Sequence, residues 1–388
     1  MKIALLTNND ALGGGATYLR HLAEGLPKNC ECRTFYSDRG ECAAKIVNAW
    51  HPDVIHVNHL RALLQFFSHW GQAPNAPVVF VVHGIHLRKY DFLPRTFANR
   101  IKRRVRLLLE RWLYRKCAAL VALTESDRAE IKRLYGDDLN VVCIPNGIAG
   151  ETMQPTTSGF NSDAVKGLQL KVGENREAGE GVSRSFLPPS EFKQDGLKFA
   201  FVCIGRFDFP KGQDILLAAI ARAAATLREQ ERRTLFIGGG ETLPEMKAFV
   251  KAHGIEDLVA FAGEQPNASD WLPCGRLLVA PSRWEGLPFL LLEAGVRSHP
   301  VIASGCPGNR DVIEDGVSGV LFPTGDVAAL AALLTRPWSD AELAALGSAL
   351  HVRVASRFAL SEMCSRTFSL FASLCSDTPG DRPHFATT

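Results

Sequence analysis

The chain has 388 residues, which is too long for one typical hydrophobic core and fits two domains of common size. Hydrophobic residues make up 46% and charged residues 22%, as in an ordinary soluble globular enzyme, and a net charge of +3 indicates no class of partner. The ten cysteines form no C-x-x-C pair and no metal-ligand cluster, which argues against disulfides and zinc and for reduced thiols in a cytosolic protein.

The N-terminal stretch predicts a strand, a glycine-rich loop and a helix. Residues 2–7 are mostly apolar, and the polar residues from Asn8 onward end this run before it could serve as a secretory signal. No later run approaches the roughly 20 apolar residues of a spanning helix. Apolar residues at helical spacing follow over 16–26, but Tyr18 occupies the third glycine position of the dinucleotide pattern G-x-G-x-x-G. A tight turn therefore remains an alternative to a ligand-binding loop at residues 13–15.

The short apolar runs 54–57 and 78–82 predict two further buried strands. The second run ends at His83, and a single histidine after a strand is more often structural than functional. His56 and His59 are interpreted as packing or surface residues. The residues alone therefore leave the role of His83 open.

Residues 86–116 form a basic segment with eleven Lys or Arg against two acidic residues, a net charge of +9. Six apolar residues recur at i, i+4, i+7, i+8, i+11 and i+12, which predicts one apolar stripe on a helix. Such a basic amphipathic helix attracts an anionic membrane surface. Alternatively the stripe packs on the sheet and the basic residues are solvated, and no motif supports nucleic-acid binding. The stripe consists of Ile101, Val105, Leu108, Leu109, Trp112 and Leu113.

Residues 120–123 and 141–144 predict the last strands of the N-terminal sheet. Periodicity then stops, because residues 151–196 are rich in Gly, Ser, Pro and charge, which indicates a linker with variable loops. From residue 197 strands and helices alternate again, and this predicts a second doubly wound unit. A helix is expected at 358–374. The expected strands of the second unit are 199–204, 235–237, 259–261, 277–280 and 301–303.

The motif G-R-F-D-F-P-K-G begins at Gly205, between the expected strand 199–204 and an expected helix over 213–227. It places Arg206 and Lys211 in a strand-to-helix loop. Ligands of open α/β sheets bind at the carboxyl ends of the strands, where helix N-termini favour anions. A guanidinium and an ammonium together suit a diphosphate, although a solvated basic loop would show the same pattern.

The second motif, R-W-E-G-L-P-F-L-L-L-E-A, runs from Arg283 to Ala294. Pro288 suits the first position of a helix. Glu285 would then lie in the entry loop and Glu293 on the helix, about 8 Å along the axis from Pro288. A carboxylate can accept both hydroxyls of a vicinal diol, so the two glutamates suit the sugar and the ribose of a nucleotide sugar. An ordinary amphipathic helix with an acidic start is the alternative.

Together these motifs resemble the retaining glycosyltransferases of family 4, also called glycosyl transferases group 1. The order G-R-x-x-x-x-K-G, about 73 further residues and then E-G-L-P-x-x-x-x-E-A-G is similar to that family. Shorter matches fall in the same order over most of the chain, including V-H-G at Val82, P-N-G-I at Pro145 and G-G-G at Gly238. The resemblance implies the α/β GT-B fold. Two doubly wound Rossmann-like domains would face a cleft, and a C-terminal helix would cross back to the first domain.

The resemblance also implies domain roles. Residues 1–190 would bind the acceptor and residues 197–357 the nucleotide sugar. Residues 358–376 would form the crossover helix, and 377–388 the tail.

By resemblance, Arg206 and Lys211 would stabilise the charge on the departing diphosphate, while Glu285 and His83 would face the donor sugar. The resemblance implies no metal and no cofactor, and no D-x-D pair lies in a suitable place. The implied donor-binding residues are Gly13, Gly14, Gly15, Gly205, Gly239, Gly286, Leu287 and Glu293.

We therefore expect a cytoplasmic retaining glycosyltransferase that moves a sugar from a nucleotide sugar, with UDP favoured, to an acceptor hydroxyl. The basic segment favours a lipid-linked or cell-surface glycan precursor as acceptor and an anionic membrane surface as partner, with no nucleic acid. Two other classes stay open: a nucleotide-sugar epimerase of GT-B fold, and a catalytically silent protein that binds the membrane surface. The broken glycine pattern disfavours a dehydrogenase.

Overall fold

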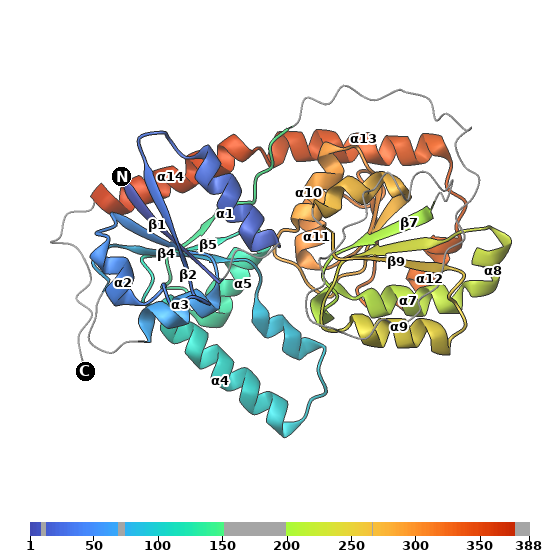
Figure 1. The fold of residues 1–388 in the computed structure, drawn as a ribbon, viewed down its shortest axis with the longest axis horizontal. Helices are drawn as coiled ribbons and strands as arrows, with labels where there is room; N and C mark the ends of the chain where they lie inside the picture. Colours follow the sequence, from blue (N-terminus) through green and yellow to red (C-terminus); the bar gives the residue numbers. More distant parts are fainter. Residues whose placement is uncertain (9–12, 69–73, 151–198, 266, 377–388) are drawn as a thin grey trace, which may run out of the picture. The chain divides into compact units, whose positions relative to one another are not determined.

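The computed structural model describes residues 1–8, 13–68, 74–150, 199–265 and 267–376 (Figure 1). The chain divides into two compact units. Unit 1 comprises residues 1–150, 284–289 and 355–388, and unit 2 comprises residues 151–283 and 290–354. The expected linker, residues 151–196, and the expected tail lie outside the described residues.

Unit 1 contains a parallel sheet of six strands in the order β2-β1-β3-β4-β5-β6. Strands β3, β4 and β5 are buried at every position, which explains their near-continuous apolar sequences. The expected strands are thereby confirmed within one residue at each end. The strands are β1 (Lys2–Thr7), β2 (Glu31–Tyr36), β3 (Val54–Val57), β4 (Val78–Val82), β5 (Ala119–Ala122) and β6 (Val141–Cys143).

Helices pack against both faces of this sheet, and their apolar residues complete its core. The helix expected at 16–26 begins earlier, at Gly14. The helices of unit 1 are α1 (Gly14–Gly25), α2 (Ala44–Ala49), α3 (Leu60–Phe67), η1 (His86–Asp91), α4 (Phe97–Tyr114), α5 (Glu125–Tyr135) and α14 (Leu360–Ser376).

The C-terminal helix α14 belongs to unit 1, as the expected crossover helix requires. Ile148 and Ala359 form an isolated parallel bridge, in which the amide of Ile148 donates to the carbonyl of Phe358 at 2.9 Å. The helix then packs against α1 and β3. A Cβ on Gly25 would lie 2.3 Å from Cys364 Sγ, so α1 and α14 touch where α1 ends.

Unit 2 contains a second parallel sheet of six strands, in the order β12-β11-β10-β7-β8-β9. The two sheets together confirm the expected α/β class with two doubly wound units. The strands are β7 (Phe199–Ile204), β8 (Thr234–Ile237), β9 (Val259–Gly263), β10 (Gly275–Ala280), β11 (Val301–Ser304) and β12 (Val320–Phe322).

The helix expected over 213–227 is two helices in the structure, because the backbone at Ala223 departs from helical geometry (φ −98°, ψ 8°). No Gly or Pro marks this break in the sequence. The helices of unit 2 are η2 (Phe209–Lys211), α7 (Gln213–Arg222), α8 (Ala224–Glu229), α9 (Leu243–Ala252), η3 (Ala268–Cys274), α10 (Phe289–Val296), α11 (Pro307–Val312), α12 (Val327–Thr335) and α13 (Asp340–Arg357). Of these, α10 begins in unit 1 and α13 ends there.

Helix α4 does not bury the apolar stripe that the sequence predicts. Only Leu113 of the six stripe residues is buried, and Leu109 is partly buried against the core. Ile101, Val105 and Leu108 are exposed, and so is Trp112. No helix in the described ranges is long and apolar enough to span a bilayer.

Candidate functional site

The loop from β7 to α7 in unit 2 carries the two predicted cations. The Arg206 side chain is 74% exposed and forms an ion pair with Asp208 at 2.6 Å. Lys211 is half-buried at the end of η2. The buried amide of Gln213, at the start of α7, donates to the carbonyl of Arg206 at 3.0 Å and fixes the loop backbone. The structure thus holds the main chain in place and leaves the guanidinium at the surface.

A second loop, after β8, packs directly on this one, backbone against backbone. A Cβ on Gly238 would lie 2.0 Å from the carbonyl oxygen of Gly205, and one on Gly240 would lie 2.4 Å from that of Phe207. The amide of Phe207 donates to the carbonyl of Gly239 at 2.8 Å. Only glycine permits these approaches. All three glycines of the G-G-G motif at Gly238 were part of the resemblance, but in these loops only Gly205 and Gly239 were predicted to bind the donor.

Arg283 holds the loop that carries Arg206 and Lys211, and this role was not predicted from the sequence. Its guanidinium makes a two-fold ion pair with Asp214 at 2.8 and 2.5 Å and donates to the carbonyl of Phe209 at 2.9 Å. Its backbone amide donates to the carbonyl of Pro210 at 2.7 Å. A bidentate pair of this kind fixes geometry as well as charge. The turn that carries Lys211 is therefore held on both sides.

Helix α10 carries Glu293 in its second turn. The helix begins at Phe289, one residue later than the start expected at Pro288. Its neighbours Leu291, Leu292 and Ala294 are fully buried, and Glu293 itself is half-buried. Glu293 is the one charged residue of α10, so the alternative of an ordinary amphipathic helix does not fit.

In unit 1, Asn58 links the first turn of α1 to His83. Its side-chain amide donates to the carbonyl of Gly15 at 2.8 Å, which turns its oxygen toward Nε2 of His83. This arrangement requires the proton on Nε2 and leaves Nδ1 as the acceptor. A Cβ on Gly15 would lie 2.7 Å from Nε2 of His59, so His59 also packs in this group. Gly15 and His83 were predicted as site residues from the sequence, whereas Asn58 was not.

Neutral His83 is favoured by its surroundings. Burial, and then the nearby His59, lower the pKa of His83 to about 3. The ring also makes an edge contact with Tyr18, at 5.1 Å between centroids. At neutral pH it can therefore offer a hydrogen-bonding group to a sugar hydroxyl without carrying charge.

The Glu285–Gly286–Leu287 loop is held by three groups of unit 1. A Cβ on Gly286 would lie 2.2 Å from the carbonyl oxygen of His83, so the two backbones touch. The buried amide of Asn146 donates to the carbonyl of Leu287 at 2.7 Å, and Arg88 donates to that of Glu285 at 3.4 Å. The second sequence motif is thus divided, with these residues in unit 1 and Arg283 and Glu293 in unit 2.

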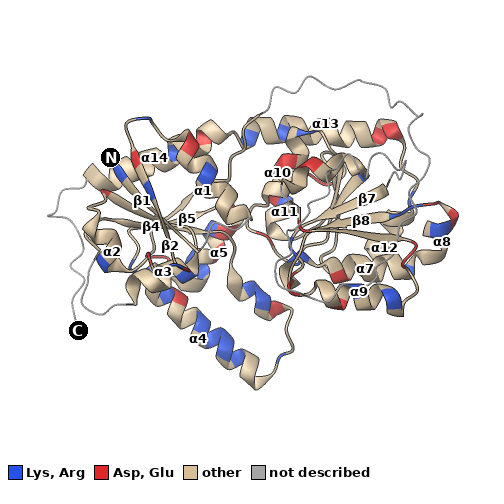
Figure 2. Cartoon of the chain, viewed as in Figure 1, with Lys and Arg blue, Asp and Glu red and all other residues tan. Residues whose placement is uncertain are grey.

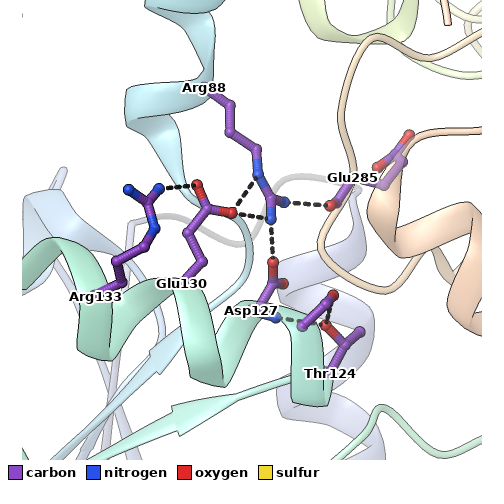
Figure 3. Close-up of polar contacts among 7 residues, drawn as sticks. Arg88, Thr124, Asp127, Glu130, Arg133 and Glu285 are labelled. Atoms are coloured by element: carbon purple, nitrogen blue, oxygen red, sulfur yellow. Dashed lines mark hydrogen bonds and ion pairs between the residues drawn. The ribbon is translucent and has the colours of Figure 1, made fainter. Parts of the chain in front are cut away.

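Arg88 belongs to a buried ionic network, drawn in Figure 3. Its guanidinium pairs with Asp127 at 2.7 Å and with Glu130 at 2.6 Å. Asp127 lies in the first turn of α5, where Thr124 accepts its backbone amide at 3.0 Å as the N-cap. Arg88 was predicted as one of the basic residues of the segment 86–116, but its side chain is only 8% exposed and donates to the Glu285 carbonyl.

Two family models match the chain along both units. "Glycosyltransferase Family 4" matches residues 35–151 and "Glycosyl transferases group 1" matches residues 198–340. The chain belongs to glycosyltransferase family 4. The first match includes His83 and Arg88, and the second includes the motif that begins at Gly205 and the motif that begins at Arg283.

Curated relatives of this family 4 chain carry names of several transferases. A D-inositol 3-phosphate glycosyltransferase of Catenulispora acidiphila is 32% identical over 233 residues, which is 56% of this chain and 48% of that protein. An Escherichia coli UDP-Gal:α-D-GlcNAc-diphosphoundecaprenol α-1,3-galactosyltransferase is 24% identical, covering 68% of this chain and 62% of that protein. The chain spans about half the length of the first of these relatives.

Solved structures share the fold of this family 4 chain. Anabaena HepE in complex with UDP and glucose superposes with a TM-score of 0.72 at 20% identity, over 96% of this chain and 100% of that one. Sucrose-phosphate synthase from Thermosynechococcus elongatus also gives 0.72 at 20% identity, over 97% and 100%. These matches confirm the GT-B fold.

Acid should destabilise this family 4 protein through His56. The ring is fully buried on β3 between Tyr18 and Phe371, and burial lowers its pKa to about 3. The folded pKa lies below the unfolded value of about 6.5, so the unfolded state binds the proton first as pH falls. The contribution of His56 to the free energy of unfolding is therefore fully present above about pH 6.5. It declines by about 1.4 kcal/mol per pH unit as the pH falls toward 3.

In the His56→Phe variant the free energy of unfolding should depend less steeply on pH between about pH 6 and pH 4, because the contribution of His56 is removed. Urea unfolding at several pH values measures it. His51→Asn is the matched control, because His51 is exposed and its φ of 53° is one that asparagine tolerates. An unchanged slope in His56→Phe would show that His56 takes up a proton without unfolding.

Proposed function

We propose that this protein transfers a sugar from a nucleotide diphosphate sugar to an acceptor hydroxyl, with retention at the anomeric carbon and with UDP as the nucleotide. The observation that carries the proposal is the loop after β7. There Arg206 presents an exposed guanidinium on a backbone fixed by Gln213, and Arg283 braces the turn that carries Lys211. Two cations at the end of a parallel strand suit a diphosphate.

The difficult step is departure of the nucleoside diphosphate. As the bond between sugar and phosphate breaks, negative charge grows on the phosphate oxygen, and Arg206 and Lys211 would stabilise it. In this proposal no metal and no cofactor take part. The acceptor hydroxyl attacks from the face that the phosphate leaves, and the departing phosphate oxygen accepts its proton.

The other predicted residues take roles around this step. Glu293 accepts the ribose hydroxyls and Glu285 those of the donor sugar, while neutral His83 bonds a sugar hydroxyl. The glycines allow close approach of the backbone to the donor. These donor-binding residues are Gly13, Gly14, Gly15, Gly205, Gly239, Gly286 and Leu287.

For the acceptor we propose a lipid-linked or cell-surface glycan precursor. The name of the Escherichia coli relative specifies a diphosphoundecaprenol acceptor for that protein, which supports this proposal. The basic segment of this chain is compatible with an acceptor carried on a lipid. Unit 1 would bind this acceptor and unit 2 the nucleotide sugar.

The first test is slow hydrolysis of donors without acceptor. The purified chain is incubated with UDP-, GDP-, ADP- and dTDP-sugars, and nucleoside diphosphate and sugar products are resolved. The proposal predicts release of UDP together with free sugar. Conversion of a donor into another nucleotide sugar, with no nucleoside diphosphate released, would instead identify an epimerase.

A further inference from the structure

Helix α4 exposes a continuous apolar surface. Nine large hydrophobic side chains are exposed among the described residues, and five of them lie on this one helix. Single exposed apolar residues are normal, but a contiguous group marks an interaction surface. The five residues, here called the α4 stripe, are Phe97, Ile101, Val105, Leu108 and Trp112, with exposures of 79, 45, 60, 64 and 49%.

The stripe follows from helical geometry. At about 100° per residue, its five positions fall within an arc of about 80°. Arg100, Arg104 and Arg111 share one edge of this arc, because their spacing of four and seven residues returns to the same side. Lys102 lies along the opposite edge. An apolar strip with cations on both edges is the pattern of a helix that lies in a membrane interface.

Contacts on the opposite face fix which side of α4 points outward. Leu113 and Tyr114 are buried in the core of unit 1. Glu110 is fully buried, accepts a hydrogen bond from the Tyr135 hydroxyl at 2.5 Å and pairs with Arg106. The helix cannot turn its stripe inward without breaking these contacts, so unit 1 by itself determines the exposure.

The charge around the stripe is almost entirely positive, as the blue band along α4 in Figure 2 shows. From residue 95 to residue 116 the one acidic side chain is Glu110, which Arg106 neutralises. Six cations there are exposed and have no ion pair with any residue that the structure describes: Arg95, Arg100, Lys102, Arg103, Arg104 and Arg111.

We propose that α4 docks on an anionic lipid bilayer, with the α4 stripe inserted at the level of the headgroups and the arginines on its edges contacting lipid phosphates. The positive charge disfavours pairing with a second copy of the same helix. The ammonium of Lys116 lies 4.6 Å above the Trp112 ring, so the indole has a cation beside it at the end of the stripe. The inference goes beyond the proposed transfer reaction and does not depend on it.

The test is flotation of the full chain with vesicles of phosphatidylcholine alone or mixed with phosphatidylglycerol. Binding is expected to the mixed vesicles only and should weaken as salt is raised. Each basic residue near such a surface strengthens binding by about fivefold, so the combined Arg100→Gln, Arg104→Gln and Arg111→Gln variant should bind about 100-fold more weakly. Leu108→Asp should lose binding as well.

Matched controls come from unit 2. Val352→Asp replaces a valine that is 66% exposed on α13, and Arg222→Gln replaces an exposed arginine on α7. Both should bind vesicles like the parent chain.

Equal binding to both kinds of vesicle, or to neither, would overturn the proposal. If Leu108→Asp bound normally and only the arginine variant failed, the surface would be a general polyanion site and the membrane assignment would be wrong. Vesicle binding needs neither donor nor acceptor, so its failure leaves the proposed transfer untouched.

Discussion

Replacing Arg206 by alanine should lower the rate of donor cleavage by about 100-fold or more, and Lys211→Ala should do the same. Both variants remove a cation that the proposal places beside the departing diphosphate. The effect should fall on the first-order rate more than on donor affinity, because charge grows on the phosphate as the bond breaks. Single-turnover release of nucleoside diphosphate measures it.

Arg222→Ala is the control, because it removes an exposed arginine from the same unit outside the loop. Its rate should equal that of the parent chain. Arg206→Lys should restore part of the rate, since the charge returns without the planar fork. Rates unchanged in both Arg206→Ala and Lys211→Ala would remove these residues from the reaction.

Gly286→Ala should lower the rate of donor cleavage by about as much as Arg206→Ala does, although it removes no charged or polar side chain. Its Cβ would lie 2.2 Å from the carbonyl oxygen of His83, so the loop that carries Glu285 would have to move. Overpacking of this kind costs about 1–3 kcal/mol. The loop is also held by Arg88 and Asn146, so part of that cost should appear as a lower unfolding midpoint.

Gly150→Ala is the matched control, because a Cβ there would meet no atom of the described residues within 4 Å. It should change neither rate nor midpoint. If Gly286→Ala cleaved donor at the parent rate, the close packing on His83 would have no part in the reaction.

The inner strands of the two sheets could be predicted from sequence because they are buried on both faces. The edge strand β2 gives a weaker signal because its first three residues are exposed. Runs such as those of β4 and β7 are apolar at nearly every position, and a glycine or histidine follows where each strand ends. The loops at those ends could therefore be located as well. Arg206 and Lys211 were proposed as diphosphate-binding residues for this reason, without knowledge of any contact, and their role stays a prediction.

The supporting residues could not be predicted, because each acts through a contact distant in sequence. Asn58 reaches His83 across 25 positions, and Arg283 reaches Asp214 across 69. From the sequence, Arg88 cannot be told apart from the other ten basic residues of its segment, because its carboxylate partners are distant in the chain. The periodicity of apolar residues predicts which residues share a face of one helix or strand, but it does not predict which residue of another element they contact.

Helix α4 shows a second limit of periodicity. The six apolar residues of the predicted stripe span more than one face, and their spacing alone does not say which of them meets the core. Leu113 is buried, whereas Val105 and Leu108 are exposed. Glu110 is buried on the inner face of the helix together with Leu113 and pairs with the partly exposed Arg106, and a charged residue gives no apolar signal in the sequence.

The most direct test of the account is calorimetric titration of the full chain with UDP, GDP, ADP and dTDP. We expect UDP to bind one site with a Kd in the micromolar to millimolar range, about that of typical enzyme substrates. Glu293→Gln should weaken this binding, because a carboxylate that accepts two ribose hydroxyls is lost. No binding of any of the four nucleotides would contradict the assignment of unit 2 as a nucleotide-sugar site and the transfer reaction built on it.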